Sequence, residues 1–186
     1  MKRGTQVVPE IRILNASSLP DFALAGAMDT VHRIFGVKVS IGRSGLDVRS
    51  AYDAYRKQVH STALLAQLLR GGALQAAKQI AVVQEDLFVP VLTFVFGEAQ
   101  LNGTVAVVST HRLSNEFYGM PANEDLMLER LEKEIVHELG HTFGLYHCRQ
   151  FECVMRSSTY VEEIDLKRAV PCAECSAAIP RARTPS

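Results

Sequence analysis

The sequence predicts a mixed α/β (α+β) fold with a mostly parallel sheet, and three observations lead to this prediction. Apolar, β-branched segments alternate with helical periodicity as far as residue 83, which is typical of parallel strands joined by crossover helices. The next two apolar segments are joined by the short loop GEAQLNG, which suits an antiparallel hairpin. The 186 residues are 47% hydrophobic, enough to bury a core of ordinary size.

The first elements are predicted from short local patterns. EIRIL at residues 10–14 indicates a strand, and Pro20 suits the first position of a helix that extends to Phe35, with Gly36 just beyond its end. VKVSI at residues 37–41 alternates apolar and polar residues, as a half-buried strand does. Together these patterns predict one β-α-β unit.

A long helix is predicted next, with Ser50 as its N-cap and the Gly71–Gly72 pair at its end. Six residues recur along one of its faces at three- and four-residue steps: Tyr52, Tyr55, Val59, Ala63, Ala66 and Leu69. Three further strands are predicted from apolar, β-branched runs bounded by turn residues, at 79–83, 92–96 and 104–109.

The stretch HELGHTFGLYH holds three histidines at the spacing of a metal site. Asn123 can cap a helix that runs through His137 and His141 to about Phe143. A four-residue step turns an α-helix by about 400°, so both imidazoles project from one face and can reach one ion. Glu138 follows directly after the first histidine and lies beside that ion without binding it.

A third ligand can come from outside the helix. Gly144 ends the helix, and the returning chain can bring His147 to the metal. Three protein ligands leave a fourth position open for water, as catalytic zinc requires. The alternative is an ordinary helix with exposed histidines. Chance alone would produce the full pattern in roughly one in 10⁵ chains, which favours the zinc site.

Four cysteines follow the histidines, and three interpretations apply to them. Disulfides are disfavoured in a reducing cytosol. CAEC resembles a thioredoxin-type redox motif, but it does not follow a first strand and head a helix as that fold requires. The third interpretation is a closed, structural zinc site, which would clamp a C-terminal segment that otherwise has little apolar material. Its ligands would be Cys148, Cys153, Cys172 and Cys175.

Composition and the chain ends narrow the function classes. Twenty basic residues balance twenty acidic ones, which argues against a nucleic-acid binder. No apolar run approaches the roughly 18 residues of a membrane span. The N-terminus lacks the apolar stretch of a signal peptide, so a cytoplasmic location is expected. PRARTPS at the end indicates a loose tail over residues 181–186.

These residues resemble the archaemetzincins, a branch of the metzincin zinc peptidases. The matching pattern is HExxHxxGxxH, then Cys148, four residues, Cys153, one residue and Met155, with a distant CxxC. The resemblance implies one zincin-like catalytic domain over residues 1–180. Its N-terminal lobe would cover about 1–144, and its small, irregular, zinc-bound C-terminal lobe about 145–180.

The resemblance also implies roles for two further parts of the chain. Met155 would lie beneath the three histidines, and the edge strand at 92–99 would pair with an extended substrate. We therefore expect a monomeric zinc metalloprotease with two zinc ions, one catalytic and one structural. It would act on peptide or protein substrates, with Glu138 as the general base. The alternative is a zinc-binding scaffold or interaction module with little turnover.

Overall fold

The structure, a computed structural model, describes residues 10–71 and 77–180. Five of the described strands form one sheet in the order β2–β1–β5–β8–β7. All neighbouring pairs are parallel except β7 and β8, which are antiparallel. The predicted mixed, mostly parallel sheet is thus confirmed. The strands are β1 (Glu10–Asn15), β2 (Lys38–Arg43), β5 (Ala77–Val83), β7 (Gly97–Ala99) and β8 (Val105–Ser109).

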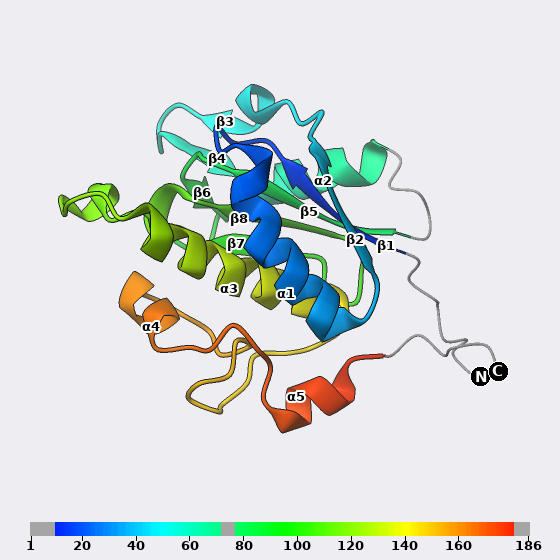
Figure 1. The fold of residues 1–186 in the computed structure, drawn as a ribbon. Coiled ribbons are helices and arrows are strands. Elements are labelled where there is room, and N and C mark those ends of the chain that lie inside the picture. Colours follow the sequence, from blue (N-terminus) through cyan, green and yellow to red (C-terminus); the bar gives the residue numbers. More distant parts are fainter. Residues whose placement is uncertain (1–9, 72–76, 181–186) are drawn as a thin grey trace.

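Helices cover both faces of this sheet (Figure 1). On one face lie α1 (Ala25–Phe35) and α3 (Glu124–Thr142), and on the other lies α2 (Ser61–Arg70). Successive residues of β5 alternate between the two cores: Ile80 and Val82 pack toward α1 and α3, whereas Ala81 and Val83 pack toward α2. All seven residues of β5 are buried, as expected for a parallel strand covered on both sides.

The first predicted helix agrees with the structure in its main part. A 3₁₀ turn, η1 (Asp21–Leu24), follows Pro20 and leads directly into α1. Gly36 ends the helix with a φ of 67°, a left-handed conformation in which glycine carries no side-chain penalty. Phe35, the last residue of α1, stacks on Phe143 at the end of α3 with 4.5 Å between ring centroids. This contact ties the two helices together.

The long helix predicted from Ser50 is wrong over its first half. Residues 48–60 form η2 (Val48–Ala51) and the strands β3 (Tyr52–Asp53) and β4 (Gln58–His60), which pair as a hairpin; α2 begins only at Ser61. The Asp53 carboxylate accepts the N–H groups of Tyr55 and Arg56, which closes the turn locally. Gln58 is buried and donates to Asp86, a distant contact that the helical periodicity did not reveal.

The predicted strand at 92–96 is also displaced. Residues near Pro90 turn instead, and the Leu92 N–H donates to the Val89 carbonyl. The strand that pairs with β8 is β7, with Glu98 opposite Val107. A second sheet in the described chain has the order β3–β4–β6, where β6 is Leu87–Phe88. The predicted antiparallel pairing is therefore correct, but the first strand of the hairpin lies at Gly97–Ala99 and not at 92–96.

The C-terminal segment lies below α3 in Figure 1 and holds two short helices, α4 (Val161–Asp165) and α5 (Ala173–Ala178). Two 3₁₀ turns, η3 (His111–Leu113) and η4 (Glu116–Tyr118), lead from β8 toward α3. Among the described residues, none of the helices is both long enough and apolar enough to span a bilayer.

Candidate metal centres and active site

The three motif histidines are brought together by α3 and the turn that follows it. The Asn123 side chain caps the helix by accepting the Leu126 N–H at 3.1 Å. Gly144 has a φ of 89°, so the chain leaves the helix there without the strain that a side chain would cause. One nitrogen from each of His137, His141 and His147 lies within 4.8 Å of the others.

Hydrogen bonds fix which ring nitrogens face the shared space. The Nδ1 atom of His137 lies 2.8 Å from the Val154 carbonyl, and that of His141 lies 2.7 Å from the Leu145 carbonyl. An Nδ1–H that donates to a carbonyl leaves Nε2 unprotonated and free to bind a metal. The two Nε2 atoms are 3.1 Å apart. Two facing lone pairs at this distance fit a shared cation.

Burial adjusts the protonation of these histidines in the same direction. It lowers the pKa of His137 well below the usual value of 6.5, and it lowers the pKa of His141 and His147 as well. The imidazoles are therefore neutral near pH 7, and neutral imidazole is the form that binds a metal. His137 is buried and His147 is exposed, so the cluster opens to solvent on one side.

Glu138 projects beside the histidines and is 5% exposed. Burial raises its pKa well above 4.5, and the nearby carboxylates of Glu134 and Glu98 raise it further. Lys167 acts in the opposite direction. A raised pKa makes this carboxylate a stronger base than an ordinary glutamate, which suits a general base.

Met155 lies against the same helix from the C-terminal segment and is fully buried. A Cβ atom at Gly140 would lie 2.9 Å from the Met155 Cε atom, which is too close for two carbon atoms. The methionine can therefore approach α3 only because Gly140 has no side chain. Gly140 was not predicted as a site residue, although a glycine between Glu138 and His141 indicates that another group packs closely against the helix there.

The four cysteines form a second cluster, with all four sulfur atoms within 4.8 Å of one another. All four are free thiols. The Cys172 N–H donates to the Cys153 sulfur at 3.2 Å, and the Gln150 N–H donates to the Cys148 sulfur at 3.4 Å. A backbone hydrogen bond involving Cys175 lowers the pKa of the Cys172 thiol. Four sulfur donors in one small space match a closed zinc site.

These two clusters imply two zinc ions, because each offers the donor set of a familiar zinc site. Three imidazoles leave one position open, as at catalytic zinc, whereas four thiols leave none. CAEC places Cys172 at the start of the short helix α5, but it follows a loop and not a first strand. The redox interpretation therefore gains nothing from the structure.

The expectation that the C-terminal segment has little apolar material is wrong. Two ion pairs also join this segment to α3: Arg130 binds Asp165 through two 2.7 Å contacts, and Lys167 lies 3.2 Å from Glu134. Lys167 and Glu134 are almost completely buried. Residues 148–180 include six buried apolar residues: Cys153, Val154, Met155, Val161, Ile164 and Ile179. Its attachment thus does not depend on the thiol cluster alone.

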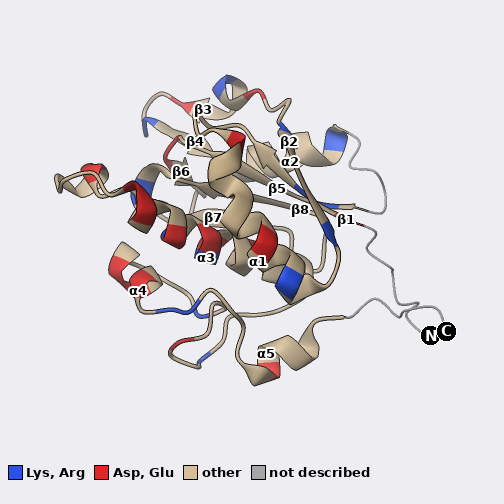
Figure 2. Cartoon of the chain, in the orientation of Figure 1, with Lys and Arg blue, Asp and Glu red and all other residues tan. Residues whose placement is uncertain are grey.

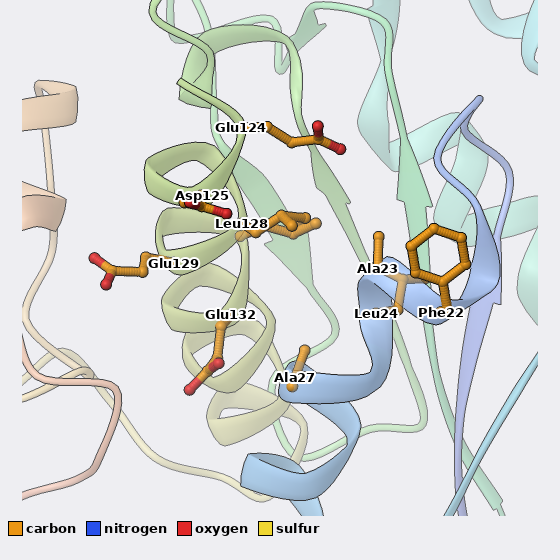
Figure 3. Close-up of a pocket in the computed structure, with 11 residues that line it drawn as sticks. Phe22, Ala23, Leu24, Ala27, Glu124, Asp125, Leu128, Glu129 and Glu132 are labelled. Carbon is orange, nitrogen blue, oxygen red and sulfur yellow. The ribbon is translucent and has the colours of Figure 1, made fainter. Parts of the chain in front are cut away.

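A surface cavity of about 580 Å³ lies elsewhere on α3, between this helix and η1–α1 (Figure 3). Leu128 points toward Ala23 across it. Acidic residues recur along α3 (Figure 2), and those lining the cavity are Glu124, Asp125, Glu129 and Glu132. These residues come from the first half of the helix, whereas His137 and His141 lie in its second half and His147 follows its end. The cavity is therefore separate from the histidine cluster.

Comparison with known proteins identifies the family. A model of Peptidase family M54 matches residues 47–181. An archaemetzincin of Thermococcus kodakarensis is 38% identical over 174 residues, which cover 89% of this chain and 92% of that protein. The crystal structure of archaemetzincin from Methanopyrus kandleri has a TM-score of 0.80 and 35% identity, covering 95% of each chain.

A further solved structure, a zinc-dependent peptidase from Methanocorpusculum labreanum, has a TM-score of 0.81 and 29% identity. It covers 91% of this chain, and this chain covers 99% of it. Together with the two clusters, these matches decide between a peptidase and a zinc scaffold. The chain belongs to peptidase family M54, the archaemetzincins, and is a zinc-dependent metalloprotease.

Proposed function

We propose that His137, His141 and His147 bind the catalytic zinc ion and that Glu138 is the general base of peptide-bond hydrolysis. The observation that carries this proposal is the pair of Nε2 atoms 3.1 Å apart, each on a ring whose Nδ1 faces a backbone carbonyl. Bound zinc supplies Lewis-acid chemistry, which lowers the pKa of water from 15.7 to about 7 and polarises a carbonyl.

Glu138 supplies the proton transfers in this scheme. Its carboxylate accepts a proton from the attacking water and passes it to the departing amine, so the group is restored after each turnover. Its burial and raised pKa support the first role, since a carboxylate with an ordinary pKa is a weaker base and accepts the proton less readily.

We further propose that Cys148, Cys153, Cys172 and Cys175 bind the structural zinc ion and that Met155 supports the histidine site from below. Four free thiols within 4.8 Å support the first assignment, and the contact of Met155 with Gly140 supports the second. In this proposal residues 1–180 are one catalytic domain with lobes at about 1–144 and 145–180, and 181–186 lie outside the described residues.

The substrate is proposed to lie along β7. In the described sheet β7 pairs only with β8, so the N–H and C=O groups of its other edge are available to an extended peptide. The substrate-binding segment expected at 92–99 is therefore proposed here as Gly97–Ala99, because only these of its residues form the strand β7.

We also propose a cytoplasmic monomer. The four-cysteine cluster supports this location, because an oxidising compartment would favour disulfides over zinc binding. Size-exclusion chromatography with light scattering of the zinc-loaded protein should give the mass of one chain, 20.5 kDa. A mass of two chains would contradict the monomer.

The direct test of the proposed base is Glu138→Gln, which keeps the size of the side chain and removes its basicity. Zinc content should stay at the wild-type value while kcat on a cleaved peptide falls about 10²–10⁴-fold. Glu129→Gln makes the same change at an exposed position of the same helix and should leave kcat unchanged. Wild-type turnover by Glu138→Gln would exclude Glu138 as the base.

A further inference from the structure

Glu138 packs against the neighbouring strand. Its side chain faces Gly97, the first residue of β7. Close packing of backbone atoms against a side chain limits the orientations that its carboxylate can take.

Gly97 leaves space for this carboxylate and little more. A Cβ atom at this position would lie 2.7 Å from the Glu138 Cγ atom and 2.8 Å from its Oε1 atom. Carbon atoms in favourable contact are about 3.5–4.0 Å apart, so any side chain at residue 97 would overlap Glu138. The same Cβ would lie 2.7 Å from the Val107 carbonyl oxygen. The strand therefore cannot accommodate a side chain by moving toward β8.

The opposite face of β7 is anchored as well. Because side chains alternate along a strand, Glu98 points away from Glu138, toward the start of α2. Its carboxylate accepts hydrogen bonds from the Ser61 hydroxyl at 2.5 Å and the Thr62 hydroxyl at 2.9 Å. The strand is thus held between α2 on one face and Glu138 on the other.

We propose that Gly97 is the positioning residue for Glu138: the bare backbone of β7 packs over the carboxylate and fixes it beside the three histidines. This proposal rests on the proposed role of Glu138 as the base. The strand proposed to bind the substrate backbone then also sets the position of the base. The substrate and the Glu138 carboxylate are therefore held in a fixed position relative to each other. A displacement of about 1 Å in such an arrangement can cost 10²-fold in rate.

The test compares Gly97→Ala with Gly42→Ala in the zinc-loaded protein. Gly42 lies in β2, the opposite edge strand, where a Cβ would meet nothing within 4 Å. Both variants should hold two zinc ions per chain. Gly97→Ala should lower kcat about 10- to 100-fold, with a smaller change in KM, and Gly42→Ala should match wild type. Wild-type kcat in Gly97→Ala would overturn the proposal.

A stability cycle tests the same contact without any turnover. Gly97→Ala should lower Tm by about 2–10 °C in the wild-type background. It should lower Tm clearly less in the Glu138→Ala background, where only the overlap with Val107 remains. A Gly97→Ala chain that folds only together with Glu138→Ala is the strongest form of this result. Equal Tm shifts in both backgrounds would overturn the proposal.

The two measurements separate this inference from the proposed function. If the wild-type protein cleaves no peptide, the role of Glu138 as a base is contradicted, whereas the Tm cycle still reports whether Gly97 and Glu138 are in contact. If Glu138→Gln loses activity as expected but the cycle shows no coupling, the base is retained and the positioning role of Gly97 is excluded.

Discussion

Single residues in this site carry pKa shifts that act in opposite directions. Burial lowers the pKa of the three histidines and raises that of Glu138. Below pH 6.5 these histidines are protonated in the unfolded chain but remain neutral in the folded protein. Their contribution to stability therefore falls as the pH falls. Glu138 does the reverse, because its folded form binds a proton more tightly than the unfolded chain does. In the zinc-free protein, the histidines and Glu138 therefore make opposite contributions to the pH dependence of stability.

Removing Glu138 should reveal the histidine contribution. In zinc-free Glu138→Gln protein, Tm should fall between pH 7.5 and 5.5, because the unfolded histidines protonate there and the buried ones do not. Adding His137→Asn should flatten this slope, whereas adding His111→Asn, outside the cluster, should not. A slope that survives His137→Asn would show that the histidine cluster is not its source. Thermal unfolding monitored by circular dichroism provides the measurement.

The residues of the site differ in how far sequence could predict them. His137, Glu138, His141 and Gly144 lie within one helix and its turn, so their relation follows from helical geometry. Gly97 could not be found in this way, because 40 residues of chain separate it from its contact with Glu138. Glycine in a strand signals close approach of another group, but the sequence does not say which group approaches.

The active-site helix depends on contacts at its C-terminal end. Lys78 reaches from β5 and donates to the Thr142 carbonyl at 2.8 Å and to the Gly103 carbonyl at 2.6 Å. The Asn102 N–H donates to the His141 carbonyl at 2.8 Å. These donors satisfy carbonyls that the end of a helix leaves without partners, and a cation there also interacts favourably with the helix dipole.

Lys78→Met should therefore loosen the last turn of α3. The variant leaves two carbonyls without their donor, which should lower the free energy of unfolding by about 1–3 kcal/mol. Lys38→Met makes the same change at an exposed position of β2 and should have little effect. Urea unfolding monitored by circular dichroism measures both. Equal midpoints for the two variants would show that Lys78 does not stabilise the helix end.

At the level of elements, strands with uniform apolar patterns were predicted correctly from the sequence. Segments whose secondary structure depends on contacts with distant residues were predicted wrongly. The apolar runs at 80–83 in β5 and 105–108 in β8 are continuous, and both strands were predicted. Residues 52–60 have helical spacing, yet the Asp53 turn and the buried Gln58 make them a hairpin. The partly buried hydrogen bond from Gln58 to Asp86 outweighs the weak helical propensity of this segment, and Asp86 lies 28 residues away in the sequence.

For the whole molecule, the segment that follows α3 is attached in three ways: by apolar burial, by two ion pairs and by the thiol cluster. A structural zinc ion contributes about 10–16 kcal/mol in zinc-finger peptides. Replacing Cys172 and Cys175 with serine should therefore lower Tm more than His147→Ala does. Hydrogen exchange should rise over residues 148–180 and stay unchanged in β5. A double variant with wild-type Tm would contradict a structural role for this cluster.

The central claim is that the two clusters bind separate zinc ions with separate tasks. Elemental analysis of His141→Ala, combined with a peptide-hydrolysis assay, tests it most directly. The wild-type protein should contain two zinc ions per chain and cleave the peptide. His141→Ala should retain one zinc ion in the thiol cluster and lose hydrolysis, because two remaining imidazoles bind the catalytic ion too weakly. Two zinc ions in His141→Ala, or wild-type hydrolysis by that variant, would contradict the account.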